Sequence, residues 1–186
     1  MNKPVYKHQS FITHKEFERT ETKRFSLELT LNENSEENLI VIMKNPSRAT
    51  LEFSDKTVFN VCNYIYLNKG NKTELKNIGK IIILNLIPFF ETYSNELVNL
   101  KSEIVCSENM KRINKFASEN SKVIIAWGNH PTGLSKEYET LKEKVFEILK
   151  NNKNEIFYVD KMSKNGNPKH AQVWSYENEL KKFARK

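Results

Sequence analysis

The chain has 186 residues, of which 38% are hydrophobic, 11% aromatic and 28% charged. This length suits a single domain over residues 1–186 with a sizeable core, and the frequent Phe, Tyr and Ile disfavour intrinsic disorder. No apolar run approaches the roughly 20 residues that cross a bilayer, and the first residues do not form a secretory signal. We therefore expect a cytoplasmic protein that has no membrane partner.

The net charge of +7 comes from 30 Lys and Arg against 23 Asp and Glu, and nearly all of the basic residues are Lys. Much of the excess lies in a basic N-terminal segment, residues 1–24, and in a basic tail, residues 181–186. Two interpretations stay open: a functional basic face for nucleic acid, or solvated termini that favour solubility.

The predicted strands are short and apolar. The first one differs from the others, because its apolar and polar residues alternate strictly, as in a half-buried strand near a sheet edge. The later ones are continuous apolar runs, typical of strands that are buried on both faces. In chain order, the predicted strands cover residues 25–31, 39–43, 81–84, 123–126 and 155–159.

Between these strands, apolar residues recur at helical spacing. This alternation indicates a parallel sheet that helices cover on both faces. We therefore expect a three-layer α/β/α domain with a mainly parallel central sheet, in which residues 25–31 form one added edge strand. The predicted helices run from a cap at Ser54 or Asp55 to near Gly70, from Ser107 through Ala117, from a cap at Ser135 through Leu149, and from Tyr176 to Ala184, the last being a closing helix within residues 175–186.

Polar residues follow the apolar runs at the predicted carboxyl ends of the strands, where open α/β sheets bind ligands. Lys44 to Arg48 follow the first buried strand, Asn85 ends the second, and Trp127-Gly128-Asn129 end the third. The fourth leads into Asp160 and a loop that ends at His170. If the predicted fold is right, two amides, a Trp-Gly turn and one imidazole converge on one edge of the sheet.

Each of these residues also has a structural interpretation. Asn45-Pro46 is a common turn pair, Trp127-Gly128 fits core packing with a tight turn, and His170 fits a merely exposed histidine. Asn85 lies within a buried run and must satisfy its donors and acceptor, either as a backbone clamp or as a ligand reader.

Several other chemistries lack their motifs. The chain has no glycine-rich dinucleotide or P-loop motif and no nucleophile elbow. Cys62 and Cys106 are far apart and belong to no Cys-x-x-Cys pair, which disfavours a disulfide framework and a structural zinc site. We expect no metal site and no cofactor, and the oligomeric state does not follow from the sequence.

Five motifs in chain order resemble a bacterial and phage family, the domain of unknown function sixteen-forty-three (DUF1643). They extend from about Arg24 to Val173, and the family itself has no assigned activity. Ala171-Gln172 depart from its pattern, because Pro-Leu usually follows the histidine. The five motifs are Val41 to Ser47, Asp55-Lys56-Thr57, Leu84-Asn85-Leu86, Ala126-Trp127-Gly128 and Gly166 to His170.

A looser resemblance is to the uracil-DNA glycosylase superfamily. Asn45-Pro46 resembles a water-handling pair after the first strand, although Met43 stands where a glycine is usual. Ile82 to Asn85 resembles a strand that ends in a base-reading Asn. Ala126 to Gly128 resembles a Leu-Trp-Gly strand end, and the stretch from His170 resembles a final His-Pro-Ser-Pro loop without its prolines. The resemblance implies a uracil-DNA-glycosylase-like sheet.

From this resemblance we expect a nucleobase- or nucleotide-directed pocket at the strand ends, in an N-glycosidase-like hydrolase that acts on DNA or a nucleotide. Asn45 would position water, Asn85 would bind a base edge, and His170 would stabilise charge on the leaving base. The expected substrate-binding residues are Asn85, Pro46, Ser47, Trp127, Gly128 and Asn129, and the expected phosphate-binding residues are Lys44, Arg48, Lys164 and Lys169.

Two alternatives stay open. The chain could be a non-catalytic module that binds nucleic acid or a nucleotide in phage–host conflict, or an enzyme that acts on an unrelated small substrate through Ser47 or His170.

Overall fold

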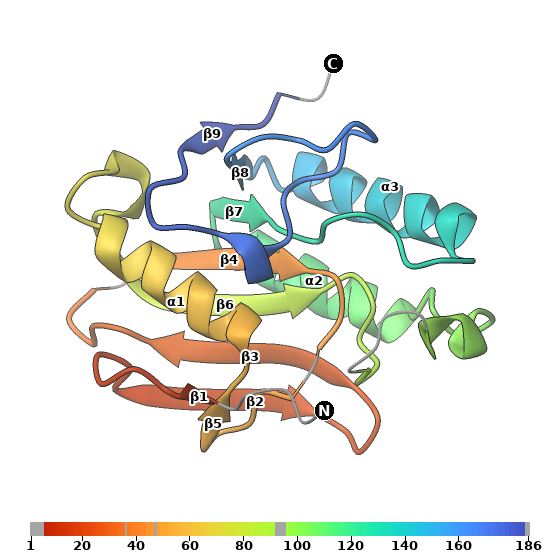
Figure 1. Cartoon of the computed structure of the whole chain (residues 1–186), viewed down its shortest axis with the longest axis horizontal. Coiled ribbons are helices and arrows are strands. Elements are labelled where there is room, and N and C mark those ends of the chain that lie inside the picture. The colour runs from red at the N-terminus through yellow and green to blue at the C-terminus, as the bar shows by residue number, and fades with distance from the viewer. Residues whose placement is uncertain (1–5, 36, 47, 92–95, 185–186) are drawn as a thin grey trace.

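Figure 1 shows a computed structural model of the chain, which describes residues 6–35, 37–46, 48–91 and 96–184. Its main sheet has seven strands, of which four central neighbours are parallel and three are antiparallel to their neighbours. The protein therefore has a mixed α/β fold. In spatial order the strands are β2 (His14–Arg19), β3 (Arg24–Thr30), β6 (Ile78–Asn85), β4 (Glu37–Met43), β7 (Lys122–Ile125), β8 (Glu155–Val159) and β9 (Leu180–Lys182).

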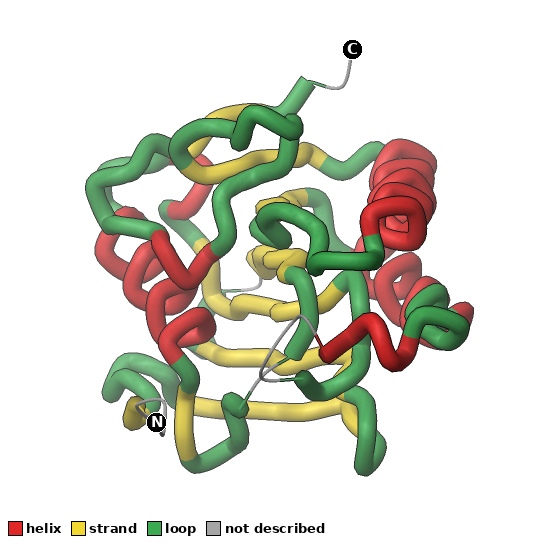
Figure 2. Tube along the Cα trace, turned by 45° about the vertical axis from the view of Figure 1, so that its right-hand side comes forward, coloured by secondary structure: helices red, strands yellow, loops and turns green. Residues whose placement is uncertain are grey.

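Helices lie on both sides of this sheet, as Figure 2 shows. One side carries α1 (Lys56–Asn68), and the other carries α2 (Ser107–Glu119) and α3 (Ser135–Asn151). The central strand β4 serves both sides, because its alternate residues belong to different apolar clusters. Leu39, Val41 and Met43 pack with α1, whereas Ile40 and Ile42 pack with α2 and α3.

The remaining elements are short. A separate two-stranded sheet pairs β1 with β5. Within the described residues, three 3₁₀ turns lie in the connections between the main strands and helices. Their bounds are β1 (Tyr6–Lys7), β5 (Phe53–Ser54), η1 (Thr73–Leu75), η2 (Glu96–Leu100) and η3 (Ala171–Val173).

Of the two helix caps predicted at α1 and α3, the structure has the first and not the second. Asp55 caps α1, because its Oδ1 accepts hydrogen bonds from the backbone N–H groups of Thr57 (2.8 Å) and Val58 (2.9 Å). The predicted cap at Ser135 is wrong, since α3 begins at Ser135 itself and Leu134 occupies the cap position with no side-chain bond. Cys62 is buried in α1, and burial raises the pKa of its thiol.

The prediction that residues 25–31 form an edge strand is wrong. The corresponding strand β3 is hydrogen-bonded to β6 on one side and to β2 on the other, so β2 is the edge. The sequence hides β2 because its side chains are mostly polar, with Phe17 as the one apolar residue in His-Lys-Glu-Phe-Glu-Arg. The basic N-terminal segment thus contributes a strand.

The predicted closing helix from Tyr176 to Ala184 is also wrong. Leu180–Lys182 form β9, which pairs antiparallel with β8 through Val159↔Leu180 and Phe157↔Lys182. The open edge of β8 offers backbone groups that a strand satisfies and a helix does not. Phe183 continues the segment by stacking on Phe146 of α3, with ring centroids 5.2 Å apart.

Candidate functional site

The carboxyl ends of β6, β4 and β7 meet at one edge of the sheet. The strand ends are joined by backbone hydrogen bonds from Leu86 N–H to the Met43 carbonyl and from Ala126 N–H to the Ile42 carbonyl, at 2.9 and 2.8 Å. The chain leaves β4 through α1 on one face and reaches β7 through α2 on the other. In open α/β sheets such a reversal of winding marks the place where ligands bind.

Asn85 is the last residue of β6 and its side chain is fully buried. Alternation along β6 puts Asn85 on the α1 side, with Ile81 and Ile83. Among the residues that the structure describes, neither Oδ1 nor Nδ2 of Asn85 has a hydrogen-bond partner. Because it bonds to no backbone group there, Asn85 is not the backbone clamp that the sequence allowed. It is an exception to the rule that buried amides are hydrogen-bonded.

Arg24 is the first residue of β3, and its side chain is fully buried beside this edge. A β-bulge aims it: Glu18 pairs with Ser26 but Arg19 pairs with Arg24, so Phe25 is an extra residue. Nη1 donates to the Ala49 carbonyl at 3.4 Å, whereas Nε and Nη2 have no partner within the described part of the chain. Burial lowers the pKa of the Arg24 guanidinium to about 10, against the opposing charge of Asp55.

Asp55 is the carboxylate of this region. It is buried at the start of α1, and its Oδ1 is already committed to two helix N–H groups. Its charge acts on Arg24 and also on His170, which places both near the helix start.

His170 lies in the connection between β8 and β9 and packs on Gly128 at the end of β7. A Cβ on Gly128 would lie 3.0 Å from the His170 Cβ, and Gly128 has a φ of +68°, so this position suits glycine on both counts. Asn60 of α1 holds the segment in place, since its Nδ2 donates to the carbonyls of Ala171 (3.3 Å) and Gln172 (2.7 Å).

The ionisation of His170 follows from its surroundings. Burial, and then the charge of Lys44, lower its pKa to about 4, although Asp55 acts in the opposite direction. Its Nδ1 accepts a hydrogen bond from the N–H of Gln172 at 3.2 Å, so the neutral ring carries its proton on Nε2. At neutral pH His170 is therefore an uncharged hydrogen-bond donor.

Lys44 is the second cation at this edge. It follows β4 directly and is partly buried, and burial lowers the pKa of its ammonium. Within the described residues the ammonium makes no hydrogen bond and no ion pair.

The side chain of Asn45 stabilises the loop after β4. Its Nδ2 donates to the carbonyls of Glu91 (2.7 Å) and Pro46 (3.0 Å), which fastens the loop after β4 to the segment after β6. Pro46 is buried and Arg48 partly buried in the same loop, whereas Ser47 lies outside the described residues. A water-positioning role for Asn45 would have to use its carbonyl oxygen.

Trp127 points away from Asn85, to the α3 side of the sheet. It is fully buried, and its ring meets that of Phe146 edge-on with centroids 5.5 Å apart. The hydroxyl of Tyr138 in α3 donates to the Trp127 carbonyl at 3.0 Å. The structure thus gives Trp127 the core packing that the sequence left open as its alternative.

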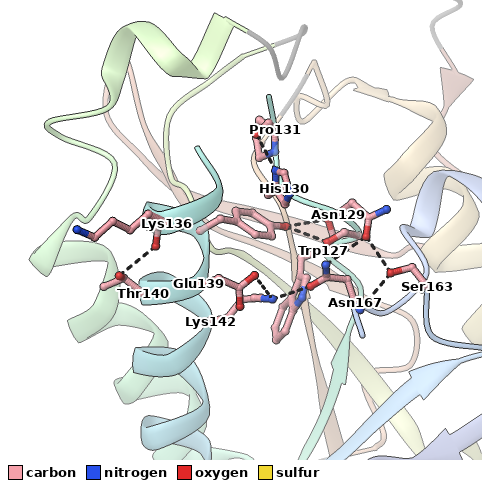
Figure 3. A network of polar contacts seen from close by, with 12 residues as sticks. Trp127, Asn129, His130, Pro131, Lys136, Glu139, Thr140, Lys142, Ser163 and Asn167 are labelled. Atoms are coloured by element: carbon pink, nitrogen blue, oxygen red, sulfur yellow. Dashed lines mark hydrogen bonds and ion pairs between the residues drawn. The ribbon is translucent and has the colours of Figure 1, made fainter. Parts of the chain in front are cut away.

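Asn129 belongs to a polar network that braces the loop before His170, shown in Figure 3. Its Oδ1 accepts from Ser163 (2.9 Å) and Asn167 (3.1 Å), and Asn167 in turn accepts from the buried ammonium of Lys142 (2.7 Å). Lys142 also pairs with Glu139. These contacts connect α3 to the loop and give Asn129 a supporting position.

The two lysines of the same loop differ. Lys164 is exposed, whereas Lys169 donates to Asp160 (2.8 Å) and Asn178 (3.2 Å) and so fastens the loop to the segment before β9. The hydrogen bond from Lys169 holds the pKa of Asp160 below its usual value. Lys169 is committed to these partners and is poorly placed to bind a phosphate.

Sequence reasoning missed Arg24 and the charge of Asp55. Arg24 belongs to the basic N-terminal segment, and nothing in the sequence signals its burial, because Lys23 directly precedes it and arginines are mostly exposed. For Asp55 the sequence predicts a helix cap and a place in a family motif, but no part in the charge of the site. The structure brings Asn85, His170, Gly128, Lys44, Arg24 and Asp55 to the same edge of the sheet.

This arrangement combines the fully buried guanidinium of Arg24 and the partly buried ammonium of Lys44 with the carboxylate of Asp55, a neutral imidazole donor and an unpartnered amide. It can bind a negatively charged group together with a planar polar group that both donates and accepts hydrogen bonds. In the described residues no three His, Cys, Asp or Glu side chains lie together as metal ligands. None of the described helices is long and apolar enough to cross a membrane.

Fold and site together define a mixed α/β protein with a buried polar site at the carboxyl edge of its sheet. Residues 24–171 match the family described as "Protein of unknown function (DUF1643)", and the chain belongs to this family. Searches of curated proteins and of solved structures gave no significant match.

Proposed function

We propose that this protein binds a nucleobase or nucleotide at the carboxyl edge of its sheet and acts as an N-glycosidase-like hydrolase. The observation that supports this most is Asn85, a fully buried amide whose donor and acceptor are both unpartnered among the described residues. A base edge offers a neighbouring donor and acceptor in one plane, which is the complement of an amide.

His170 would act on the leaving base. N-glycosidic cleavage leaves negative charge on the departing base, and a neutral Nε2–H donor stabilises that charge without repelling the ground state. The hydrogen bond from Gln172 to Nδ1 fixes the required tautomer. As part of the proposal, the sheet with its helices is an arrangement like that of the uracil-DNA glycosylases, and the loop after β4 holds the water.

Two observations favour a second function, a non-catalytic module that binds nucleic acid or a nucleotide. Arg24 and Lys44 place two cations at this edge, one fully and one partly buried, and their charge opposes the positively charged sugar of an N-glycosidic transition state. The amide nitrogen of Asn45 is already bonded to two carbonyls. Both facts suit tight binding of an anionic ligand better than fast cleavage.

The test is a calorimetric panel of free bases, nucleosides and short single-stranded DNA, measured on the wild-type chain and on Asn85→Leu. We expect one base to bind in preference, and Asn85→Leu to weaken that base by about 10- to 100-fold, as for loss of two buried hydrogen bonds. Asn71→Leu is the matched control, because Asn71 is an exposed asparagine beyond the far end of α1.

Equal affinity of Asn85→Leu and wild type for every base would contradict the proposed binding. Release of free base from DNA or from a nucleotide, assayed by chromatography, distinguishes the hydrolase from the module. Loss of that release in His170→Gln with retained binding would assign the step to His170.

A further inference from the structure

A second feature of the edge is the unsatisfied guanidinium of Arg24. The side chain is fully buried. Within the described residues it makes one long hydrogen bond, from Nη1 to the Ala49 carbonyl, and its Nε and Nη2 make none. Phe17 lies under the guanidinium at 5.8 Å, so one face of the group is packed on a ring. A buried arginine normally forms several charged hydrogen bonds, and this one has at least two donors to spare.

Asp55 does not supply those bonds. Its Oδ1 caps α1, and no hydrogen bond joins it to Arg24 within the described residues. The charge of Asp55 acts on Arg24 but leaves these donors without a bond, and the ammonium of Lys44 also lacks a partner among those residues. Burying an uncompensated cation is costly, and an anionic ligand removes that cost.

The geometry of the backbone supports the same conclusion. The β-bulge at Phe25 re-aims Arg24 towards the start of α1, and the Ala49 carbonyl that it contacts belongs to the loop after β4. Arg24 thus reaches the carboxyl edge of the sheet from β3, whereas Asn85 ends β6 and Lys44 follows β4.

We propose that Arg24 and Lys44 form an oxyanion subsite that takes the phosphate of a nucleotide or of a nucleic-acid backbone, next to the base-reading Asn85. Arg24 joins Lys44 in this role, whereas Lys169 is committed to Asp160 and Asn178. The planar guanidinium offers Nε–H and Nη2–H side by side, which matches two oxygens of one phosphate. The identity of the phosphate as part of a nucleotide rests on the proposed function, whereas its binding does not.

The experiment titrates inorganic phosphate into the full chain by calorimetry, with chloride at matched ionic strength as the reference. We expect phosphate to bind, and Arg24→Met and Lys44→Met each to weaken it by about 10- to 100-fold, the effect of losing charge-assisted hydrogen bonds. Arg19→Met is the matched control, since Arg19 is the exposed partner of Arg24 across the strands. Lys44→Met keeps the test valid if Arg24→Met does not fold.

A parallel titration compares a nucleoside with its 5′-monophosphate, and it distinguishes the two proposals. A monophosphate that binds no tighter than its nucleoside, or phosphate affinity that Arg24→Met and Lys44→Met leave unchanged, would overturn the oxyanion subsite while base binding stands. Phosphate binding that depends on Arg24, together with equal affinity for all bases, would uphold the subsite and contradict the proposed base recognition.

Discussion

At the scale of single residues, Asn85 lowers the stability of the protein without ligand. Its amide has left water and found no partner among the described residues, and a group in that state costs about 1–3 kcal/mol. Asn109 is the instructive contrast. It is equally buried and its Oδ1 also has no partner among the described residues, but its Nδ2 donates to the carbonyls of Asn85 (2.9 Å) and Leu86 (3.2 Å) at the end of β6.

We therefore expect Asn85→Leu to raise the free energy of unfolding by about 1–3 kcal/mol, because a leucine of similar size replaces an unpaired amide. Asn109→Leu should lower it by a similar amount, because two carbonyls lose their donor. Urea unfolding of both variants measures this, and a destabilised Asn85→Leu would show that the amide is bonded in solution.

His170 makes stability depend on pH. Its pKa is lowered from 6.5 to about 4 in the folded protein, so between these values the unfolded chain binds a proton that the folded chain does not. The free energy of unfolding should then fall as the pH drops from about 6.5 to about 4, by about 3 kcal/mol at most, and this term should be constant above that range.

Urea unfolding at pH 7 and near pH 4.5 checks this on wild type and His170→Gln. The variant should lose this part of the pH dependence, whereas His14→Gln, on the exposed strand β2, should keep it. An identical acid response in His170→Gln and wild type would contradict the burial of a neutral imidazole.

At the scale of elements, the turn after β7 determines where His170 sits. Gly128 and Gly166 both have positive φ, +68° and +67°, but only the Cβ position of Gly128 is close to a neighbour, the His170 Cβ at 3.0 Å. Nothing lies within 4 Å of the Cβ position of Gly166. Substitutions at the two glycines therefore distinguish the effect of backbone strain, which both share, from the effect of contact with His170, which only Gly128 has.

Gly128→Ala and Gly166→Ala should each lower the free energy of unfolding by about 1–2 kcal/mol, the cost of a side chain in the left-handed region. Only Gly128→Ala should also displace His170, seen as a change in its NMR ring signals and in ligand affinity. Matching His170 signals in wild type and Gly128→Ala would refute the close packing.

At the scale of the whole molecule, strands from both ends of the chain flank the parallel core. β4 lies between two parallel neighbours, whereas β2 and β9 are edge strands. β2 is largely polar and partly exposed, and β9 is a short strand of three residues. Local opening therefore needs much less free energy at the edges than at the centre.

Hydrogen exchange followed by mass spectrometry should rank the strands accordingly. Peptides from β4, β6 and β7 should exchange slowest, at rates close to global unfolding, and those from β2 and β9 orders of magnitude faster. Protection of β9 equal to that of β4 would mean that the C-terminal segment opens only with the whole sheet.

The structure also changes the interpretation of the net positive charge, because part of the basic tail forms ion pairs. Lys181 and Lys182 of the basic tail pair with Glu179 and Glu155 at 3.0 and 2.6 Å, so these two lysines belong to the edge of the sheet. The cations that matter for the proposed ligand are the buried Arg24 and the partly buried Lys44, and they are a small part of the net charge of +7.

The elements whose signal is local follow from the sequence alone. Runs such as Ile81 to Leu84 are apolar on both faces and can only be buried strands, and Asp55 before a helical pattern can cap it through its own backbone neighbours. The strand-end rule likewise predicts that Asn85 and His170 lie at the same edge of the sheet.

Features that depend on a distant partner follow from the assembled sheet and cannot be predicted from local patterns. β2 and β9 are strands because the open edges of β3 and β8 need hydrogen bonds, and neither segment has an apolar pattern that shows this. Trp127 packs on α3, and a bulge aims Arg24 at the site. These outcomes depend on which strands and helices become neighbours when the sheet forms, and that is a property of the whole fold.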